Sequence, residues 1–223
     1  MQNALNRRIL CYVTNGTDFP ASTRHPDLVA RITAALEAGV DWIQIREKQL
    51  SPKALLALAR EAGQVAQSQQ RAAQIIMNDR LDVALAAPSS GVHLGNPSLS
   101  CAVVAGWLKN RGPKEDFSIG VSCHSLQDAL RAESAGADYI LFGPVFDTPS
   151  KRAFGAPQGL EALANARAAV KIPLLAIGGV NQENAFDCLH AGASGIAAIR
   201  LFQESPSAAR LADFVSRVHA FNC

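Results

Sequence analysis

The chain has 223 residues, of which 48% are hydrophobic and 18% charged, and its net charge is +2. That charge disfavours a polybasic nucleic-acid binder and a highly charged disordered chain, and the length can supply a large core. No apolar run reaches the roughly 20 residues of a membrane helix, and five scattered cysteines without a CxxC pair indicate reduced thiols. Composition therefore predicts a soluble, cytoplasmic protein without nucleic-acid or membrane partners.

Short apolar segments recur along the chain and alternate with stretches of helical periodicity. The expected strands cover residues 9–14, 41–46, 73–77, 91–94, 118–122, 139–143, 174–177 and 195–199. Strands this apolar are typical of a parallel sheet that is buried on both faces. The expected helices include residues 26–38, a helix that starts at Ser51-Pro52, and residues 125–136 and 182–192.

Three of these helices end at a glycine or directly before one, namely Gly39, Gly136 and Gly192, and such a glycine can relieve a left-handed C-terminal residue. Eight strand–helix units in about 220 residues favour an α/β fold with a single (β/α)8 TIM barrel over residues 1–223. A doubly wound sheet shows the same alternation and stays open as an alternative.

Polar residues follow nearly every expected strand, which is where α/β enzymes carry their active sites. Because alternate residues of an extended chain share a side, we expect Gln44, Arg46 and Lys48 to line up. The other strand ends carry Asn78, Asp79, His93, Ser122, Cys123, His124, Thr148, Ser150, Lys151, Gly178 and Gly179. We expect His93 to be a packed, hydrogen-bonded histidine and the cysteines to be packing residues.

These residue types predict that the strand ends handle anions at two places. Arg46, Lys48 and Lys151 supply positive charge, and arginine can grip two phosphate oxygens. Asp79 is a hard oxygen ligand that suits Mg²⁺. Thr148, Ser150 and the turn at 178–179 can bind a second phosphate. The sequence has no Ser-His-Asp order, zinc spacing, GxGxxG or Walker motif.

Six segments together resemble the thiamine-phosphate synthase family. They are residues 44–48, 78–80, 91–95, 120–124, 143–151 and 176–180, and they follow one another in the family's order from about residue 10 to residue 200. The resemblance implies the barrel. It also implies that hydroxymethylpyrimidine diphosphate loses pyrophosphate to leave a stabilised cation, which the nitrogen of thiazole phosphate attacks to give thiamine phosphate.

The resemblance also implies roles for individual residues. Asp79 would ligate Mg²⁺, and Arg46, Lys48, Ser122 and Lys151 would act in catalysis. The pyrimidine diphosphate would be held by Gln44, Arg46, Lys48, Asn78 and Lys151, with Ser122 on its pyrophosphate. The substrate-binding set is completed by His124, Thr148, Ser150, Gly178, Gly179, Ile199 and Arg200, of which all but His124 and Gly178 are expected at the thiazole phosphate.

Two positions depart from the family pattern. Ser98 stands where the synthases have a second Mg²⁺-binding Asp, and Arg200 stands where they have a small Ser. The related thiazole tautomerase also lacks that Asp, but it carries a catalytic His where this chain has Pro144, so its proton carrier here would be His124 or Cys123. A phosphate-ligand binder without catalysis is a third alternative. The apolar faces of the outer helices further suggest a homodimer.

Overall fold

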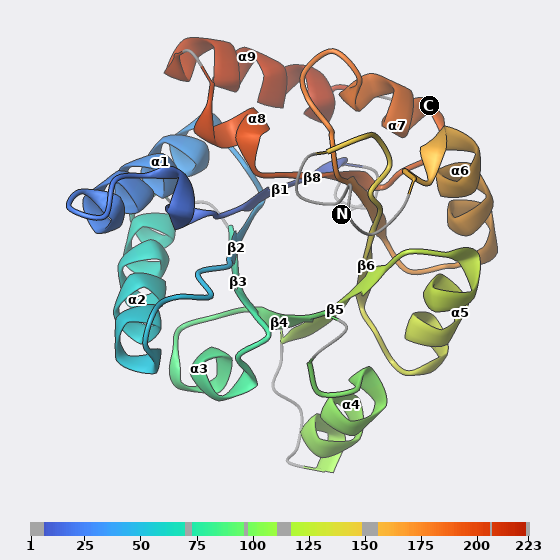
Figure 1. The fold of residues 1–223 in the computed structure, drawn as a ribbon, viewed down its shortest axis with the longest axis horizontal. Coiled ribbons are helices and arrows are strands. Elements are labelled where there is room, and N and C mark those ends of the chain that lie inside the picture. The colour runs from blue at the N-terminus through green and yellow to red at the C-terminus, as the bar shows by residue number, and fades with distance from the viewer. Residues whose placement is uncertain are drawn as a thin grey trace.

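The structure is a computed structural model that describes residues 7–69, 73–95, 98–110, 117–148, 156–205 and 207–221. Eight parallel strands follow one another around a closed barrel in chain order, and β8 pairs with β1 to complete the ring (Figure 1). The closed ring confirms the (β/α)8 barrel and excludes the doubly wound alternative. The extent of the domain over all of residues 1–223 stays a prediction.

Every expected strand is present, with ends that differ by at most one residue from the prediction. The strands are β1 (Ile9–Val13), β2 (Trp42–Ile45), β3 (Gln74–Asn78), β4 (Gly91–Leu94), β5 (Ser118–Cys123), β6 (Tyr139–Phe142), β7 (Leu174–Ile177) and β8 (Gly195–Ala198). Their near-complete burial explains why each reads as a continuous apolar run.

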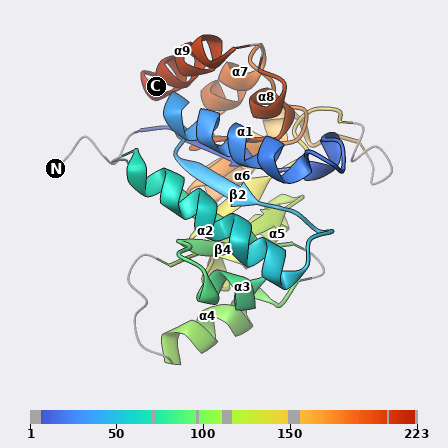
Figure 2. The ribbon, with the colours of Figure 1, turned by 90° about the vertical axis from the view of Figure 1, so that its left-hand side faces the viewer.

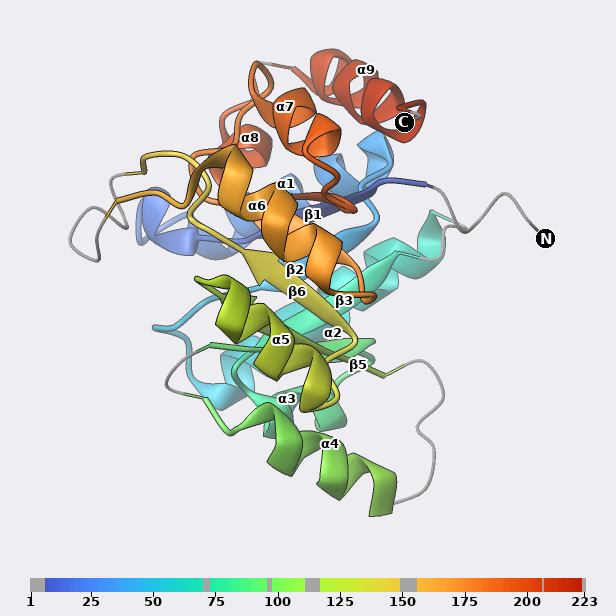
Figure 3. The same cartoon turned by 90° about the vertical axis from the view of Figure 1, so that its right-hand side faces the viewer.

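Helices surround the strands. They are the short 3-10 helix η2 (Gly16–Asp18), α1 (Arg24–Ala38), α2 (Pro52–Ser68), α3 (Leu81–Ala86), α4 (Cys101–Asn110), α5 (Leu126–Ser134), α6 (Gly159–Ala169), α7 (Ala185–His190), α8 (Arg200–Gln203) and α9 (Ala208–His219). Figure 2 shows α1 and α2 side by side on one flank, and Figure 3 shows α5 and α6 on the other. No helix in these described ranges is long and apolar enough to span a membrane.

Helix ends follow the expected local chemistry. The Ser51 hydroxyl accepts a hydrogen bond from the backbone N–H of Ala54 and so caps α2, whose first residue is Pro52. Gly39, Gly136 and Gly192 all have positive φ, which confirms the predicted glycine punctuation before β2, β6 and β8.

The core has two layers because strand residues alternate between the inside and the outside of the barrel. The inner cluster of buried residues comprises Cys11, Val13, Ile76, Tyr139, Leu141, Leu175 and Ala197. The larger outer cluster joins the other faces of the strands to the helices. The inner cluster fills the barrel below the strand ends, so ligands have access only to the polar side chains above it.

The first strand and the last helix meet at one carboxylate. Asp41 directly precedes β2 and accepts hydrogen bonds from the backbone N–H of Leu10 (2.8 Å) and from the His219 ring (2.9 Å). Arg7 forms an ion pair with the same carboxylate (2.9 Å). Residues from both ends of the described chain are thereby fixed beside the start of β1 and β2.

Candidate functional site

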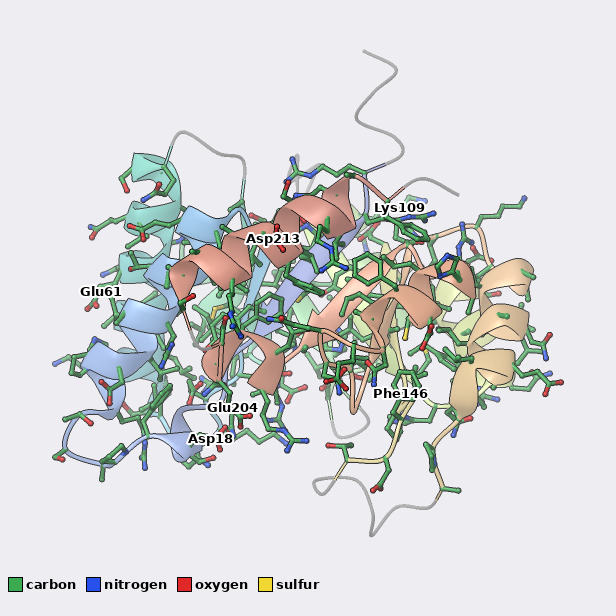
Figure 4. The ribbon with its side chains drawn as sticks, turned by 90° about the horizontal axis from the view of Figure 1, so that it is seen from above. Asp18, Glu61, Lys109, Phe146, Glu204 and Asp213 are labelled. Atoms are coloured by element: carbon green, nitrogen blue, oxygen red, sulfur yellow. The ribbon has the colours of Figure 1, made fainter. Side chains whose placement is uncertain are left out.

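The candidate site lies where the strands end. In Figure 4, Asp18, Phe146 and Glu204 all lie on that side of the molecule, whereas Lys109 at the end of α4 lies on the opposite side. Side-chain hydrogen bonds join the predicted residues there in two groups, Gln44 with Asn78 and Asp79, and His93 with Ser122.

A directed chain of hydrogen bonds joins the ends of β2 and β3. The Gln44 side-chain amide donates from Nε2 to Asn78 Oδ1 (2.9 Å), and Asn78 Nδ2 donates to Asp79 Oδ2 (2.6 Å). Gln44 is 2% exposed, and its Oε1 has no hydrogen-bond partner among the described residues. A buried, unpartnered acceptor is costly, so this atom is suited to receive a donor from a ligand.

Asp79 presents its carboxylate from an unusual backbone conformation. Its φ of 62° makes it the one non-glycine residue with positive φ in the described ranges. Its backbone N–H donates to His93 O (2.8 Å), and its Oδ1 accepts from Gly95 N–H (3.1 Å) and from the Ser98 hydroxyl. Left-handed geometry is uncommon outside glycine and is found at functional sites, and here it turns the carboxylate to the end of β4.

Ser98 therefore contacts the predicted metal ligand directly. Its oxygen also accepts a hydrogen bond from Gly95 N–H (2.8 Å). Within the described ranges, no three His, Cys, Asp or Glu side chains lie close enough together to coordinate a metal ion. The donors that do gather are one carboxylate and one hydroxyl, which fit an ion such as Mg²⁺ that keeps several waters and takes its remaining ligands from substrate phosphates.

His93 is packed inside the barrel, as predicted. It is 1% exposed, and its ring hydrogen bonds with Ser122 Oγ through Nε2 (2.8 Å) and with the Tyr139 hydroxyl through Nδ1 (3.2 Å). Burial lowers the pKa of His93 from 6.5 to about 4, with the Asp79 charge opposing that shift. The imidazole is thus neutral at pH 7, and it holds the hydroxyl of Ser122 at the end of β5.

Two cations, Arg46 and Lys48, were predicted to line up after β2. The strand pattern accounts for Arg46 but not for Lys48. β2 ends at Ile45, with Gln44 buried and Arg46 half-buried. Lys48 lies in a turn and is exposed, so the expectation that all three side chains line up through the pleat was wrong for Lys48. The alternation ends because the chain leaves the barrel there to begin α2 at Pro52.

The turn after β7 offers backbone rather than side-chain groups. Gly178 and Gly179 have φ of 93° and 68°, and a Cβ at Gly179 would lie 2.7 Å from Phe146 Cβ. The carbonyl of Gly178 accepts from Phe146 N–H (3.0 Å), and that of Gly179 accepts from Asn184 Nδ2 (3.1 Å). The tight turn is therefore required by packing, and within the described ranges no acceptor pairs with the Gly179 N–H.

The start of α8 adds two more backbone donors. The N–H groups of Ile199 and Arg200 follow β8 and have no acceptor among the residues described. The Arg200 side chain is exposed, so it does not fill a pocket. Thr148, which follows β6, is buried with 9% exposure. Unpaired N–H groups at the end of a barrel's last strands are suited to phosphate.

The remaining predicted residues fall into two groups. His124 is half-buried, with its Nδ1 against the carbonyl of Gly143, while Cys123 beside it is fully buried. Burial raises the pKa of the Cys123 thiol to about 12, which makes it a packing residue as predicted. Ser150 and Lys151 lie outside the described residues.

Sequence reasoning missed two polar residues beside this site. Glu47 is 3% exposed, and Thr14, at the end of β1, is fully buried and donates its hydroxyl to Glu47 Oε1 (2.6 Å). A charge placed between Arg46 and Lys48 looks like part of a solvated run. No local pattern marks Glu47, because its partners Thr14 and Gly16 lie 33 and 31 residues earlier in the chain.

Known proteins resemble this chain over most of its length. A family model described as thiamine monophosphate synthase matches residues 10–202. The thiamine-phosphate synthase of Chlorobium phaeobacteroides is 44% identical over 165 residues, covering 74% of this chain and 77% of its own. That of Chlorobium luteolum is 40% identical over 205 residues, covering 92% and 90%.

A solved structure gives the same answer at the level of the fold. The thiamine phosphate pyrophosphorylase from Pyrococcus furiosus superposes with a TM-score of 0.80 at 31% identity, covering 96% of both chains. The closed barrel, the side chains joined at the ends of β2 to β5 and the matched length all lead to one assignment. The chain belongs to the thiamine monophosphate synthase family.

Proposed function

We propose that this chain condenses hydroxymethylpyrimidine diphosphate with thiazole phosphate to give thiamine phosphate and pyrophosphate. The bond between the pyrimidine methylene carbon and the diphosphate oxygen breaks, and its electron pair leaves with pyrophosphate. The thiazole nitrogen then donates its lone pair to the resulting cation. The protein's task is to stabilise the departing charge and to hold the nucleophile in line, so the reaction needs no strong base.

The observation that carries this proposal is the directed hydrogen-bond chain from Gln44 through Asn78 to Asp79. Every donor in it points toward the carboxylate, which leaves Gln44 Oε1 free to accept from the amino group of an aminopyrimidine. Arg46 and Lys48 follow β2, and Ser122 lies near the end of β5, where the three would bind the diphosphate. Lys151 and Asn78 complete this expected set.

Asp79, with the Ser98 hydroxyl beside it, would hold Mg²⁺. When bound, the ion would supply positive charge to the diphosphate oxygens. Support comes from the donor set, because a carboxylate that accepts three hydrogen bonds still has lone-pair capacity for a cation. Asn78 and Gly95 would keep the carboxylate oriented, since each donates to one of its oxygens.

The turn at Gly178 and Gly179 and the start of α8 would hold the thiazole phosphate. Unpaired N–H groups of Gly179, Ile199 and Arg200 support this assignment, and the exposed Arg200 guanidinium would add charge at the rim. Thr148 and Ser150 would contribute hydroxyl groups, and His124 would line the same side. The two phosphates are thus bound by opposite halves of the barrel mouth.

The test is direct. Purified protein incubated with both substrates and Mg²⁺ should release thiamine phosphate and pyrophosphate in equal amounts, and EDTA should abolish both. Absence of product at saturating substrate would overturn the proposal. The tautomerase alternative is not favoured, because the curated relatives in the two Chlorobium species are thiamine-phosphate synthases and Pro144 stands where the tautomerase carries its His. Of the two candidate proton carriers, Cys123 keeps its proton at neutral pH, which leaves only His124.

We further propose that the protein works in the cytoplasm as a homodimer. The large hydrophobic residues that are exposed in the described ranges are Leu99, Val103, Trp107 and Leu126. Val103 and Trp107 are four residues apart on α4, and Leu99 lies four residues before Val103, just ahead of the helix. Sedimentation of the Val103→Glu variant should then show monomer where the wild type shows dimer. Equal sedimentation of both proteins would contradict this assignment.

A further inference from the structure

The chain segment that carries Arg46 and Lys48 has no regular structure of its own. β2 ends at Ile45 and α2 begins at Pro52, so residues 46–51 cross the barrel rim without a strand or helix ladder. Two cations in such a segment would be free to move apart, because like charges repel and side-chain entropy favours many orientations. The geometry at Glu47 supplies the missing restraint.

The Glu47 carboxylate is held on the outer side of the barrel wall. Its Oε1 accepts from the Thr14 hydroxyl (2.6 Å), and Gly16 N–H donates to both Oε2 (2.8 Å) and Oε1 (3.0 Å). A Cβ at Gly16 would lie 2.5 Å from Glu47 Oε2, so the loop after β1 fits closely against the carboxylate. Such charge-assisted bonds are the stronger kind, and the carboxylate is buried among them.

The same hydroxyl reaches the backbone of the cation segment. Thr14 Oγ1 accepts from Arg46 N–H (3.0 Å), and Thr14 N–H donates to Gln44 O (2.9 Å). Thr14 thus donates to the Glu47 side chain while it holds the main chain on either side of Ile45. These hydrogen bonds continue the pairing of β1 with β2 past Ile45, the last residue of β2, as far as Arg46.

Burial is the largest influence on the charge of this carboxylate, and it raises the pKa of Glu47 above its usual value. The hydrogen bonds from Thr14 and Gly16 and the charges of Arg46 and Arg24 oppose that shift. Arg24 Nε also donates to Gly16 O (2.8 Å), which ties the loop to α1.

We propose that Glu47 is a positioning residue, whose hydrogen bonds with Thr14 and Gly16 hold Arg46 and Lys48 in the orientation that binds the diphosphate. This rests on the proposed function for the identity of the anion. It does not require Glu47 to touch substrate. These hydrogen bonds restrain only the segment after β2. Losing them should therefore leave the site expected to hold the thiazole phosphate unchanged.

Two variants with one matched control test this. Thr14→Val removes the hydroxyl at nearly constant shape, Thr14→Ser retains it, and Glu47→Gln removes the charge. Calorimetric titration with inorganic pyrophosphate should give a Kd about tenfold weaker for Thr14→Val and Glu47→Gln. Thr14→Ser should stay within twofold of wild type, as should the KM for thiazole phosphate in all three. Pyrophosphate affinity unchanged in a folded Thr14→Val would overturn the inference.

A ligand-free measurement separates this inference from the proposed function. Hydrogen exchange at the Arg46 amide should accelerate in Thr14→Val and stay slow in Thr14→Ser, whatever the protein binds. Equal exchange in both would overturn the positioning role. If wild type shows the exchange pattern but binds no pyrophosphate, the assigned anion and the proposed function are wrong, while the restraint on the segment stands. If Glu47→Gln fails to fold, the two Thr14 variants decide alone.

Discussion

The barrel mouth has two halves that are built from different groups. The β2–β5 half consists of side chains that bond to one another, among them Gln44, Asn78 and Asp79. The β7–β8 half consists of the glycine turn at 178–179 and the first amides of α8. Side chains in a network can hold a metal and a highly charged diphosphate, whereas fixed N–H groups suit a monophosphate whose charge does not change in the reaction.

Substitutions in the two halves should have different consequences. Loss of one member of the side-chain half leaves the backbone intact and removes charge or a hydrogen bond from the site. Loss of a glycine in the backbone half disturbs the path of the chain itself. Mutations in the first half should therefore act on activity more than on stability, and those in the second half on both.

The largest effect is expected for Asp79→Asn. Asn tolerates the left-handed backbone of this position, so the variant should fold while it loses the charge. We expect kcat/KM to fall by roughly 10³-fold, because charge stabilisation at the leaving group is lost. Asp82→Asn is the matched control, since Asp82 is exposed and pairs with Arg80. Steady-state kinetics of both variants is the measurement, and equal activity would contradict the role of Asp79.

The second effect is a pH dependence of stability. The unfolded chain protonates His93 below about pH 6.5, but the folded protein resists this until about pH 4. Unfolding therefore takes up a proton in that window, and the free energy of unfolding should drop by about 3 kcal/mol as the pH falls through it. Urea titrations of wild type and His93→Gln from pH 7 to pH 4 measure this. Parallel curves for the two proteins would refute the buried neutral imidazole.

The third prediction probes the backbone half. Gly179→Ala should lower the free energy of unfolding by about 2 kcal/mol, because its φ is positive and its Cβ would meet Phe146 and Asp147. It should also raise the KM for thiazole phosphate. Gly159→Ala isolates the conformational part, since Gly159 has φ of 77° with open space around a Cβ. If both variants lose the same stability, the close approach at Gly179 contributes nothing.

The smallest effect is a gain. Ser98→Asp adds a second carboxylate beside Asp79, and we expect the apparent affinity for Mg²⁺ to rise about tenfold. Without metal the two carboxylates repel, so the variant should melt lower than wild type in EDTA and recover with Mg²⁺. Ser98→Asn has the same shape without the charge. An identical Mg²⁺ response in the Asp and Asn variants would separate Ser98 from the metal site.

The sequence predicts the scaffold better than it predicts the site. Buried parallel strands can be recognised in the sequence, because each is a short apolar run that ends in polar residues. The glycines after α1, α5 and α7 show where the next strand begins. The bond between Thr14 and Glu47 leaves no such mark, because it joins side chains 33 residues apart on neighbouring strands. The turn that carries Lys48 away from β2 was missed for another reason, because the alternation of an extended strand was carried past Ile45, where β2 ends.

The contact of Asp41 with Arg7 and His219 has a consequence for biosynthesis. A ribosome delivers β1 first and α9 last, yet β1 pairs with β8 and its Leu10 amide shares Asp41 with α9. The early strands must therefore wait with one edge unpaired until nearly the whole chain has emerged. In a circular permutant that links the present termini and begins at another loop, a different strand would remain unpaired until synthesis is nearly complete.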